Sequence, residues 1–212
     1  MQRKVMKRIK RTVLTLLFLP SLVLSQQIEN DVKTALLIID IQNFYFPGEG
    51  PGLIGAEEAS LNAKEVLGIF RAQHQLVVHV RHKAARGFEI HKNVEPIANE
   101  KVITKEEVNS FVGTDLLEYL KGNNISRLVV IGMQTQMCME AAVRAGHDYG
   151  FECIVIQDAC ATRDLTFMGR TVKAEDVHIS TLAAINDGGY GKVLDLNNFK
   201  ENANKYLYQK SD

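Results

Sequence analysis

The clearest pattern along the chain is an alternation of short apolar runs with longer amphipathic segments. Apolar runs rich in β-branched residues predict strands at residues 34–40, 76–80, 101–104, 128–131, 153–157 and 192–196. Apolar residues at helical spacing predict helices at residues 57–72, 114–122, 135–150 and 174–185. Strands that alternate with helices usually form a parallel sheet, because the crossover between parallel strands is a helix. The pattern therefore predicts an α/β fold with a mainly parallel sheet flanked by helices on both faces.

The first 25 residues have the composition of a secretory signal peptide. Basic residues are frequent among residues 1–11, and the apolar run at residues 13–24 is short for a membrane span. Small residues before the cleavage point favour cutting near Ser25 and Gln26. We therefore expect a signal peptide at residues 1–25 and a single domain at residues 26–212. The mature protein should be periplasmic or secreted, without stable membrane insertion. N-terminal sequencing of the exported protein should then find a start near Gln26, and an intact N-terminus on cytoplasmic protein would contradict this. An uncleaved N-terminal anchor is the alternative.

Composition excludes several other classes of protein. A chain of 212 residues that is 46% hydrophobic and 24% charged suits one domain with a full core. The formal net charge is +0, and much of the positive charge lies in the first 25 residues, so the mature protein should be acidic. There is no basic stripe interleaved with aromatic residues, so nucleic acid is not an expected partner. No G-x-G-x-x-G follows a predicted strand, which argues against a dinucleotide cofactor.

Cys138 has the sequence position of a reactive thiol. It falls in the first turn of the helix predicted after the strand at residues 128–131, with Thr135 as the helix cap. Ligands bind at the carboxyl edge of open α/β sheets, and the positive end of a helix dipole favours a thiolate. The alternative is a small buried apolar residue, which is what most free cysteines are. Cys153 and Cys160 are more simply core and loop residues than a disulfide, and three cysteines leave at least one thiol free.

Three short motifs follow one another along the chain. The first is a D-x-Q at the end of the first strand, the second is a lysine ahead of an Asn-Ser-Phe segment, and the third surrounds the cysteine. Their residues are Asp40, Ile41 and Gln42; Lys105, Asn109, Ser110 and Phe111; and Gly132, Thr135, Cys138, Ala141 and Ala142. Together they resemble the motifs of the isochorismatase-like cysteine hydrolases, a family that includes nicotinamidases and N-carbamoylsarcosine amidase. The resemblance spans roughly residues 33–199 and implies a three-layer Rossmann-like fold.

The resemblance implies a catalytic role for Asp40, Lys105 and Cys138. Cys138 would attack an amide-type carbonyl to form a thioester, and Asp40 would carry the proton. Lys105 would hold Asp40 and favour the thiolate. The resemblance also implies a cis peptide bond between Met133 and Gln134, with an oxyanion hole formed by the N–H groups of Gln134 and Cys138. We therefore expect a hydrolase that cleaves a non-peptide C–N bond of a small amide-type substrate.

Aromatic and basic residues near the same edge of the sheet are candidates for a substrate pocket. The run of aromatic residues 44–46 follows Asp40, and His82 follows the second predicted strand. We interpret Phe44, Phe46 and His82 as pocket residues, with core packing the alternative for Phe44 and a solvated loop the alternative for His82. The segment after the fifth predicted strand contains Asp158, Thr162 and Arg163. We interpret these residues either as structural support or as part of a contact between subunits, because we expect a homo-oligomer.

The residues of a metal site are missing from the sequence. Nicotinamidases hold a divalent metal through an Asp-x-His pair and a further histidine, and no Asp-x-His follows Asp40. We therefore expect neither a metal nor another cofactor.

Two alternative functions stay open on the same fold. One is hydrolysis of a vinyl ether of the isochorismatase type, which needs no cysteine nucleophile, and the other is a non-catalytic or thiol-redox protein.

Overall fold

A computed structural model describes residues 32–48, 50 and 52–209 of the chain. The signal peptide expected at residues 1–25 lies outside the described residues, so cleavage and export stay predictions. Within the described part, no helix combines the length and the apolar character needed to cross a bilayer.

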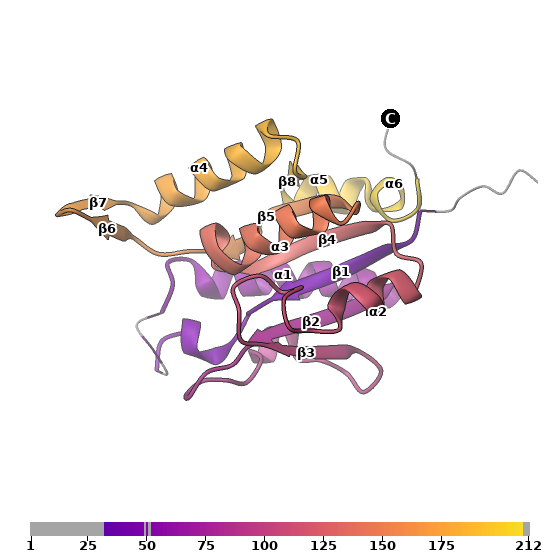
Figure 1. Ribbon diagram of the computed structural model, residues 1–212, viewed down its shortest axis with the longest axis horizontal. Helices are drawn as coiled ribbons and strands as arrows, with labels where there is room; N and C mark the ends of the chain where they lie inside the picture. Colours follow the sequence, from indigo (N-terminus) through magenta and orange to yellow (C-terminus); the bar gives the residue numbers. More distant parts are fainter. Residues whose placement is uncertain (1–31, 49, 51, 210–212) are drawn as a thin grey trace, which may run out of the picture. The chain divides into compact units, whose positions relative to one another are not determined.

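A six-stranded parallel sheet forms the centre of the fold (Figure 1). Its strands lie in the order β3-β2-β1-β4-β5-β8, and every neighbouring pair is parallel. Their bounds are β1 (Thr34–Ile39), β2 (Leu76–His82), β3 (Lys101–Lys105), β4 (Arg127–Met133), β5 (Glu152–Ala161) and β8 (Lys192–Leu194). The chain builds outward from β1 to β3 and then returns to β4 on the other side of β1. This reversal creates a crevice at the carboxyl ends of β1 and β4, where ligands bind in folds of this kind.

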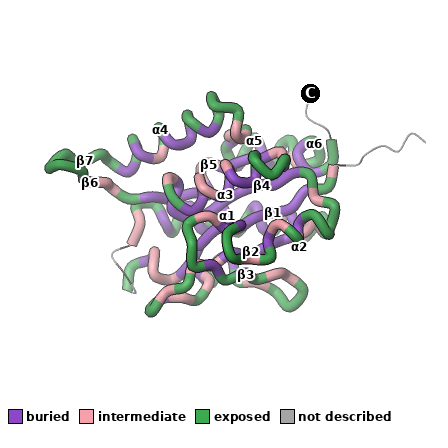
Figure 2. The backbone as a smooth tube through the Cα atoms, in the orientation of Figure 1, coloured by how far each residue is buried: buried purple, intermediate pink, exposed green. Residues whose placement is uncertain are grey.

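Helices cover both faces of the sheet, which confirms the predicted three-layer α/β architecture. One face packs against α1 (Ala56–Ala72), α5 (Leu196–Glu201) and α6 (Ala203–Tyr208). The other face packs against α2 (Leu116–Gly122), α3 (Glu140–Asp148) and α4 (Ala174–Asp187). The central strands are therefore buried on both sides, as Figure 2 shows for β1 and β4.

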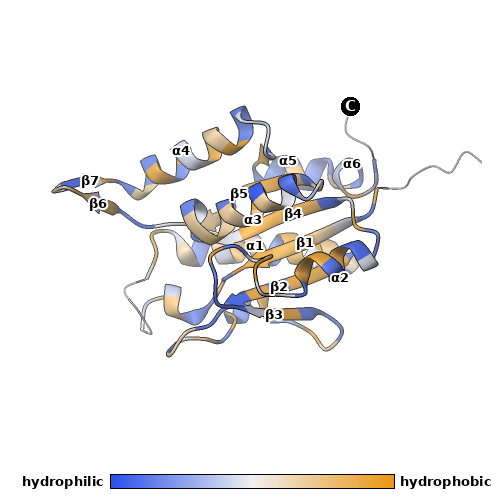
Figure 3. Ribbon diagram, in the orientation of Figure 1, coloured by the Kyte–Doolittle hydropathy of each residue, from blue (hydrophilic) through white to orange (hydrophobic). Residues whose placement is uncertain are grey.

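The central strand β1 supplies apolar side chains to both layers in alternation. Leu36 and Ile38 join the core under α1, whereas Ala35, Leu37 and Ile39 join the core under α2 and α3. This alternation follows from the two-residue period of a strand, and a strand buried on both faces must be apolar throughout. Figure 3 accordingly shows the middle of the sheet as the most hydrophobic part of the fold.

β2, β3, β4 and β5 all run further than the apolar pattern predicts, and the extensions of β4 and β5 have identifiable causes. Gly132 was expected to end its strand, but β4 continues through it to Met133. The backbone of Gly132 has φ +131°, and a Cβ there would overlap the main-chain oxygen of Ile39, so only glycine fits this close approach. β5 continues to Ala161. Its register with β4 shifts after Val130, so β5 contains additional residues at this irregularity. An apolar pattern along the sequence does not reveal such a shift.

The C-terminal part of the chain contains elements that the sequence pattern did not predict. The strand expected at residues 192–196 ends at Leu194, and α5 and α6 follow it. β6 (Leu165–Phe167) and β7 (Arg170–Val172) form an antiparallel hairpin that projects from the sheet (Figure 1). These short strands have no buried face and therefore no apolar alternation. At the tip of the hairpin, Phe167 is 78% exposed and Met168 is 85% exposed. The expected homo-oligomer stays a prediction.

All three cysteines are free thiols and all are buried. Cys153 packs in the core under α3, as expected. Cys160 lies inside β5 rather than in a loop. Neither side chain belongs to the group of residues around Cys138 that is described next.

Candidate active site

Asp40, Lys105 and Cys138 meet at the carboxyl edge of the sheet. Asp40 comes directly after β1, Lys105 is the last residue of β3, and Cys138 follows β4. The ammonium Nζ of Lys105 lies 2.9 Å from Asp40 Oδ2 and 3.1 Å from Cys138 Sγ. All three side chains are buried. The fold thus brings together the three residues that the motifs singled out, which we call the Asp-Lys-Cys cluster.

The backbone at Asp40 turns away from the sheet at the point where β1 ends. Its φ is +51°, in the left-handed region that aspartate tolerates better than most residues. The N–H of Asp40 still donates to the carbonyl oxygen of Val80, at 2.9 Å, so the turn stays anchored to β2. The preceding five residues are all buried and apolar. The carboxylate is therefore the first polar group at the ligand edge of this strand.

Cys138 lies on a π-helical turn, not on the first turn of an α-helix. This turn, Thr135–Met139, precedes α3, and its first residue was expected to cap the helix. The Thr135 hydroxyl instead contacts His178 Nδ1 at 2.9 Å, and no side-chain cap forms at the start of the turn. Single π-turns often occur at functional sites. Here the turn carries Cys138 to the side of Lys105.

Its surroundings disfavour the thiolate form of Cys138. Burial raises the pKa of the thiol to about 12, the negative charge of Asp40 raises it as well, and the positive charge of Lys105 opposes both. Burial and the neighbouring carboxylate therefore act against the helix dipole, which favours a thiolate. The thiol must therefore be deprotonated during a reaction, which requires a base next to it.

Asp40 has the properties of such a base. Burial raises its pKa above the ordinary range of a carboxyl group, while the charge and hydrogen bond of Lys105 and the hydrogen bond of Cys138 lower it. A carboxylate with a raised pKa accepts a proton more readily than an exposed one does. Since Lys105 is its ion-pair partner, Asp40 can be ionised in the resting site despite its burial.

A second set of polar side chains surrounds Gln134, next to the cluster. The peptide bond between Met133 and Gln134 is cis, as the family resemblance implies. The side-chain oxygen of Gln134 accepts from Arg163 Nε at 3.2 Å. The hydroxyl of Tyr45 is also in hydrogen-bond contact with the Gln134 side chain, and burial raises the pKa of Tyr45. The charges of Asp40 and Cys138 raise the pKa of this hydroxyl, and the charge of Arg163 lowers it.

The three residues interpreted as pocket lining have different positions in the structure. Phe46 is buried in the core and stacks on His91, with ring centroids 3.7 Å apart, so its main role is packing. Phe44 is half-buried and packs edge-on against Tyr45. His82 joins the cluster directly, because its Nδ1 lies 3.0 Å from Lys105 Nζ. Tyr45 belongs to the predicted aromatic run, and Arg163 was interpreted as structural support or an oligomer contact; both contact the Gln134 side chain.

Three side chains in and beside the cluster are of types that bind metal ions. Asp40, His82 and Cys138 each offer one ligand atom, and these atoms lie within 4.8 Å of one another. The Lys105 ammonium contacts all three, at 2.9 to 3.1 Å. A cation of the protein itself therefore occupies the position that a metal would take. This set of residues does not fit a resident metal while Lys105 is in place.

We therefore expect activity to survive the removal of divalent metals. Dialysis of the purified enzyme against a chelator should leave the rate on its best substrate unchanged, since the ammonium of Lys105 already provides the positive charge. Metal analysis of the same sample confirms the removal. A loss of activity that zinc or another divalent ion restores would contradict this expectation, with Asp40, His82 and Cys138 as the first ligands to test.

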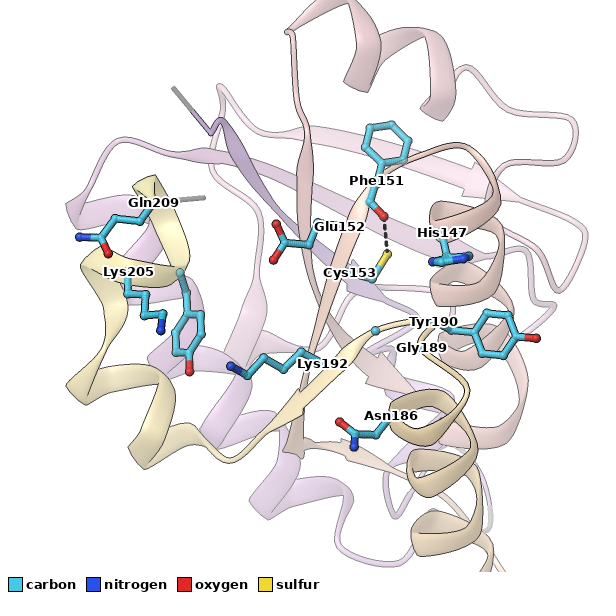
Figure 4. A pocket seen from close by; sticks show the side chains of 12 residues that line it. His147, Phe151, Glu152, Cys153, Asn186, Gly189, Tyr190, Lys192, Lys205 and Gln209 are labelled. Carbon is cyan, nitrogen blue, oxygen red and sulfur yellow. Dashed lines mark hydrogen bonds between the residues drawn. The ribbon is translucent and has the colours of Figure 1, made fainter. Parts of the chain in front are cut away.

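A separate cavity of about 460 Å³ opens at the opposite, amino edge of the sheet (Figure 4). It is bordered by Glu152 and Cys153 at the start of β5, by Lys192 at the start of β8 and by Lys205 of α6. None of the residues of the Asp-Lys-Cys cluster lines it. The cavity is therefore distinct from the candidate active site.

Known proteins match this chain over most of its length. The Isochorismatase domain family matches residues 34–176. The isochorismatase family protein YddQ of Bacillus subtilis is 42% identical over 173 residues, which cover 76% of this chain and 96% of that protein. Maleamate amidohydrolase of Pseudomonas putida is 28% identical over 190 residues, or 76% of this chain and 83% of that protein. The crystal structure of an isochorismatase hydrolase from Oleispira antarctica has a TM-score of 0.74 and 39% identity, covering 78% of this chain and 95% of that one.

The fold and the matched motifs define a three-layer α/β protein of the isochorismatase-like hydrolase class with a buried thiol at the carboxyl edge of its sheet. The chain belongs to the isochorismatase family, which confirms the resemblance drawn from its three motifs.

Proposed function

We propose that the protein is a cysteine-dependent amidohydrolase that cleaves a C–N bond of a small molecule through a thioester on Cys138. The observation that carries this proposal is the buried Asp-Lys-Cys cluster, in which one ammonium contacts both a carboxylate and a thiol. The isochorismatase family includes amidohydrolases, among them the maleamate amidohydrolase that this chain resembles. The cluster supplies a nucleophile, a proton carrier and a fixed positive charge, which amide hydrolysis requires.

The first half of the reaction forms the thioester. Asp40 takes the proton of Cys138 as the sulfur attacks the substrate carbonyl, and the carbonyl oxygen becomes negatively charged. The N–H groups of Gln134 and Cys138 would stabilise that oxygen, in the oxyanion hole that the family resemblance implies. Protonated Asp40 then donates its proton to the departing nitrogen, so that an amine or ammonia leaves and the acyl group stays on Cys138.

The second half releases the acid and restores the thiol. A water molecule attacks the thioester, and Asp40 removes its proton. The tetrahedral intermediate collapses with loss of the sulfur, which recovers its proton from Asp40. Lys105 contacts both groups that change charge in these steps, so it stabilises the negative charge as this charge moves between Asp40 and Cys138.

The residues around Gln134 favour a polar substrate. Arg163 is a cation that donates to Gln134, and the Tyr45 hydroxyl is in hydrogen-bond contact with the same glutamine side chain. An amide that carries an acidic group would pair with this arginine, since charge-assisted hydrogen bonds are stronger than neutral ones. We therefore include amides with and without a carboxylate in the test of function.

The test is a substrate panel with ammonia release as the measurement. Simple primary amides, ureido acids, maleamate and nicotinamide represent C–N substrates, and isochorismate represents a vinyl ether. We expect ammonia from at least one amide with the wild-type protein and none with the Cys138→Ala variant. Cleavage of isochorismate that survives Cys138→Ala, without hydrolysis of any amide, would instead establish the vinyl ether reaction and overturn the proposal.

A further inference from the structure

The ammonium of Lys105 has more hydrogen-bond acceptors around it than the reaction uses. Its Nζ lies 2.9 Å from Asp40 Oδ2, 3.0 Å from His82 Nδ1, 3.0 Å from the carbonyl oxygen of Glu107 and 3.1 Å from Cys138 Sγ. An ammonium has only three N–H groups, and hydrogen bonds from Lys105 Nζ go to His82 Nδ1, the Glu107 carbonyl oxygen and Cys138 Sγ, while Asp40 is its ion-pair partner. Asp40 and Cys138 change their protonation in the proposed reaction, whereas His82 and the Glu107 carbonyl do not. The latter two are therefore a fixed support for the ammonium.

We propose that His82, held by Gln42, is a positioning residue that keeps the Lys105 ammonium between Asp40 and Cys138. The inference rests on the proposed function, because positioning matters only if the cluster reacts. His82 lies directly opposite Lys105 in the pairing of β2 with β3, at the carboxyl end of both strands. Its ring therefore reaches the ammonium from the neighbouring strand.

Gln42 fixes the backbone of His82 on both sides. The side-chain oxygen of Gln42 accepts from the His82 N–H at 2.7 Å, and its side-chain nitrogen donates to the His82 carbonyl oxygen at 3.0 Å. The same nitrogen donates to the Phe88 carbonyl oxygen at 2.8 Å. Gln42 is fully buried, and it stands two residues after Asp40. The D-x-Q motif thus supplies Asp40 as the base. Through Gln42, the same motif also positions His82, which supports Lys105.

The contact with Lys105 determines which atom of the His82 ring faces the ammonium. An ammonium can only donate hydrogen bonds, so Nδ1 of His82 acts as an acceptor toward Lys105 Nζ. Asp40 after β1, Glu106 beyond β3 and Cys138 on the π-turn are further charged or titratable groups that lie beside this ring or act on it.

A neutral support suits the movement of charge in the proposed reaction. When Asp40 takes the thiol proton, the negative charge passes from the carboxylate to the sulfur. An ammonium held by uncharged acceptors can strengthen its contact with Cys138 Sγ at that moment without a change of place. A carboxylate at position 82 would pair permanently with Lys105 and reduce the charge available to the sulfur.

The experiment compares His82→Asn with His82→Leu. The side-chain oxygen of asparagine can stand where Nδ1 stands, while leucine fills the space without an acceptor. We expect His82→Leu to lower kcat by about 100-fold, the effect of a misplacement of about 1 Å in an active site. Alkylation of Cys138 by iodoacetamide should also slow, by about tenfold, because the thiolate loses the contact of the ammonium. His82→Asn should recover most of both rates, since its side-chain oxygen supplies the missing acceptor.

His91→Asn is the matched control. The His91 Nδ1 also accepts a hydrogen bond, from the Asn93 N–H, but the ring stacks on Phe46 away from Lys105. This variant should keep the wild-type alkylation rate and pH profile. Thermal unfolding of all variants identifies any that fail to fold.

Two results would overturn the proposal. One is a folded His82→Leu variant with wild-type turnover and alkylation, and the other is an equal loss of both rates in the folded leucine and asparagine variants. The alkylation rate needs no substrate. The support of Lys105 by His82 is therefore tested even if every amide in the panel fails, which separates this inference from the proposed function.

Discussion

Replacing Cys138 by alanine should abolish amide hydrolysis while leaving the fold intact. The change removes the nucleophile, and loss of a catalytic nucleophile typically lowers kcat by more than ~10⁴-fold. Alanine is a good helix former and adds no bulk, so the buried position loses only the packing of one sulfur atom. Ammonia release from the best substrate of the panel measures the effect, and thermal unfolding measures the stability of the variant.

Cys153→Ala and Cys160→Ala are the matched controls for this change. Both thiols are free and buried, and burial raises the pKa of each to about 12, as it does for Cys138. Neither contacts the Lys105 ammonium, so both variants should keep activity. Near-normal hydrolysis by Cys138→Ala would contradict the covalent mechanism and favour a reaction carried out by water or on a vinyl ether.

Asp40→Asn should be nearly as damaging as the loss of the nucleophile. Asparagine keeps the size and shape of the side chain but cannot accept the thiol proton, so turnover should fall by about 10³- to 10⁴-fold. The double variant Asp40→Asn with Cys138→Ala should be scarcely slower than Cys138→Ala alone, because residues that act as a unit do not have additive effects. Steady-state rates of the three variants on one substrate provide the comparison. Additive losses would show that Asp40 acts separately from the cysteine.

Lys105→Ala extends the same comparison to the positive charge. Lys105 lowers the pKa of Cys138 and of Asp40, so its removal should raise both, slow turnover severely and slow alkylation of Cys138 at neutral pH. Lys83→Ala serves as the control, because Lys83 pairs with Glu106 at the surface near the same edge of the sheet. Surface pairs contribute little, so that variant should behave like the wild type.

The parts of the site that could be predicted from the sequence are those fixed by local pattern. The apolar run before Asp40 predicts a buried strand, and the first polar residue after it must lie at the carboxyl edge of the sheet. The same reasoning places Lys105 at the end of a short strand and Cys138 after another. Motif resemblance then selects these three residues among the other polar residues at that edge.

The parts that could not be predicted depend on contacts between distant residues. The π-turn that carries Cys138 has the composition of an ordinary helix start, and the Thr135 hydroxyl contacts His178, 43 residues further along the chain. A run of three aromatic residues has no periodicity that separates core from pocket. Stacking on His91 places Phe46 in the core, while Tyr45 lies beside Gln134.

The electrostatic environment of the Cys138 thiol could not be predicted from the sequence either. A helix start favours the thiolate, but only the structure shows that Cys138 is almost fully buried beside an acidic group. The role of Gln42 is similar. The D-x-Q motif identifies the glutamine, whereas its hydrogen bonds to His82 appear only when β1 and β2 are paired.

The most direct test of the account is detection of the thioester during turnover. The enzyme is quenched in acid at short times with its best amide substrate, and the peptide containing Cys138 is analysed by mass spectrometry. The account predicts an added mass equal to the acyl part of the substrate, absent from Cys138→Ala, and a hydroxamate product when hydroxylamine is present. Turnover of the amide with unmodified Cys138 at every quench time, and without hydroxamate, would contradict it.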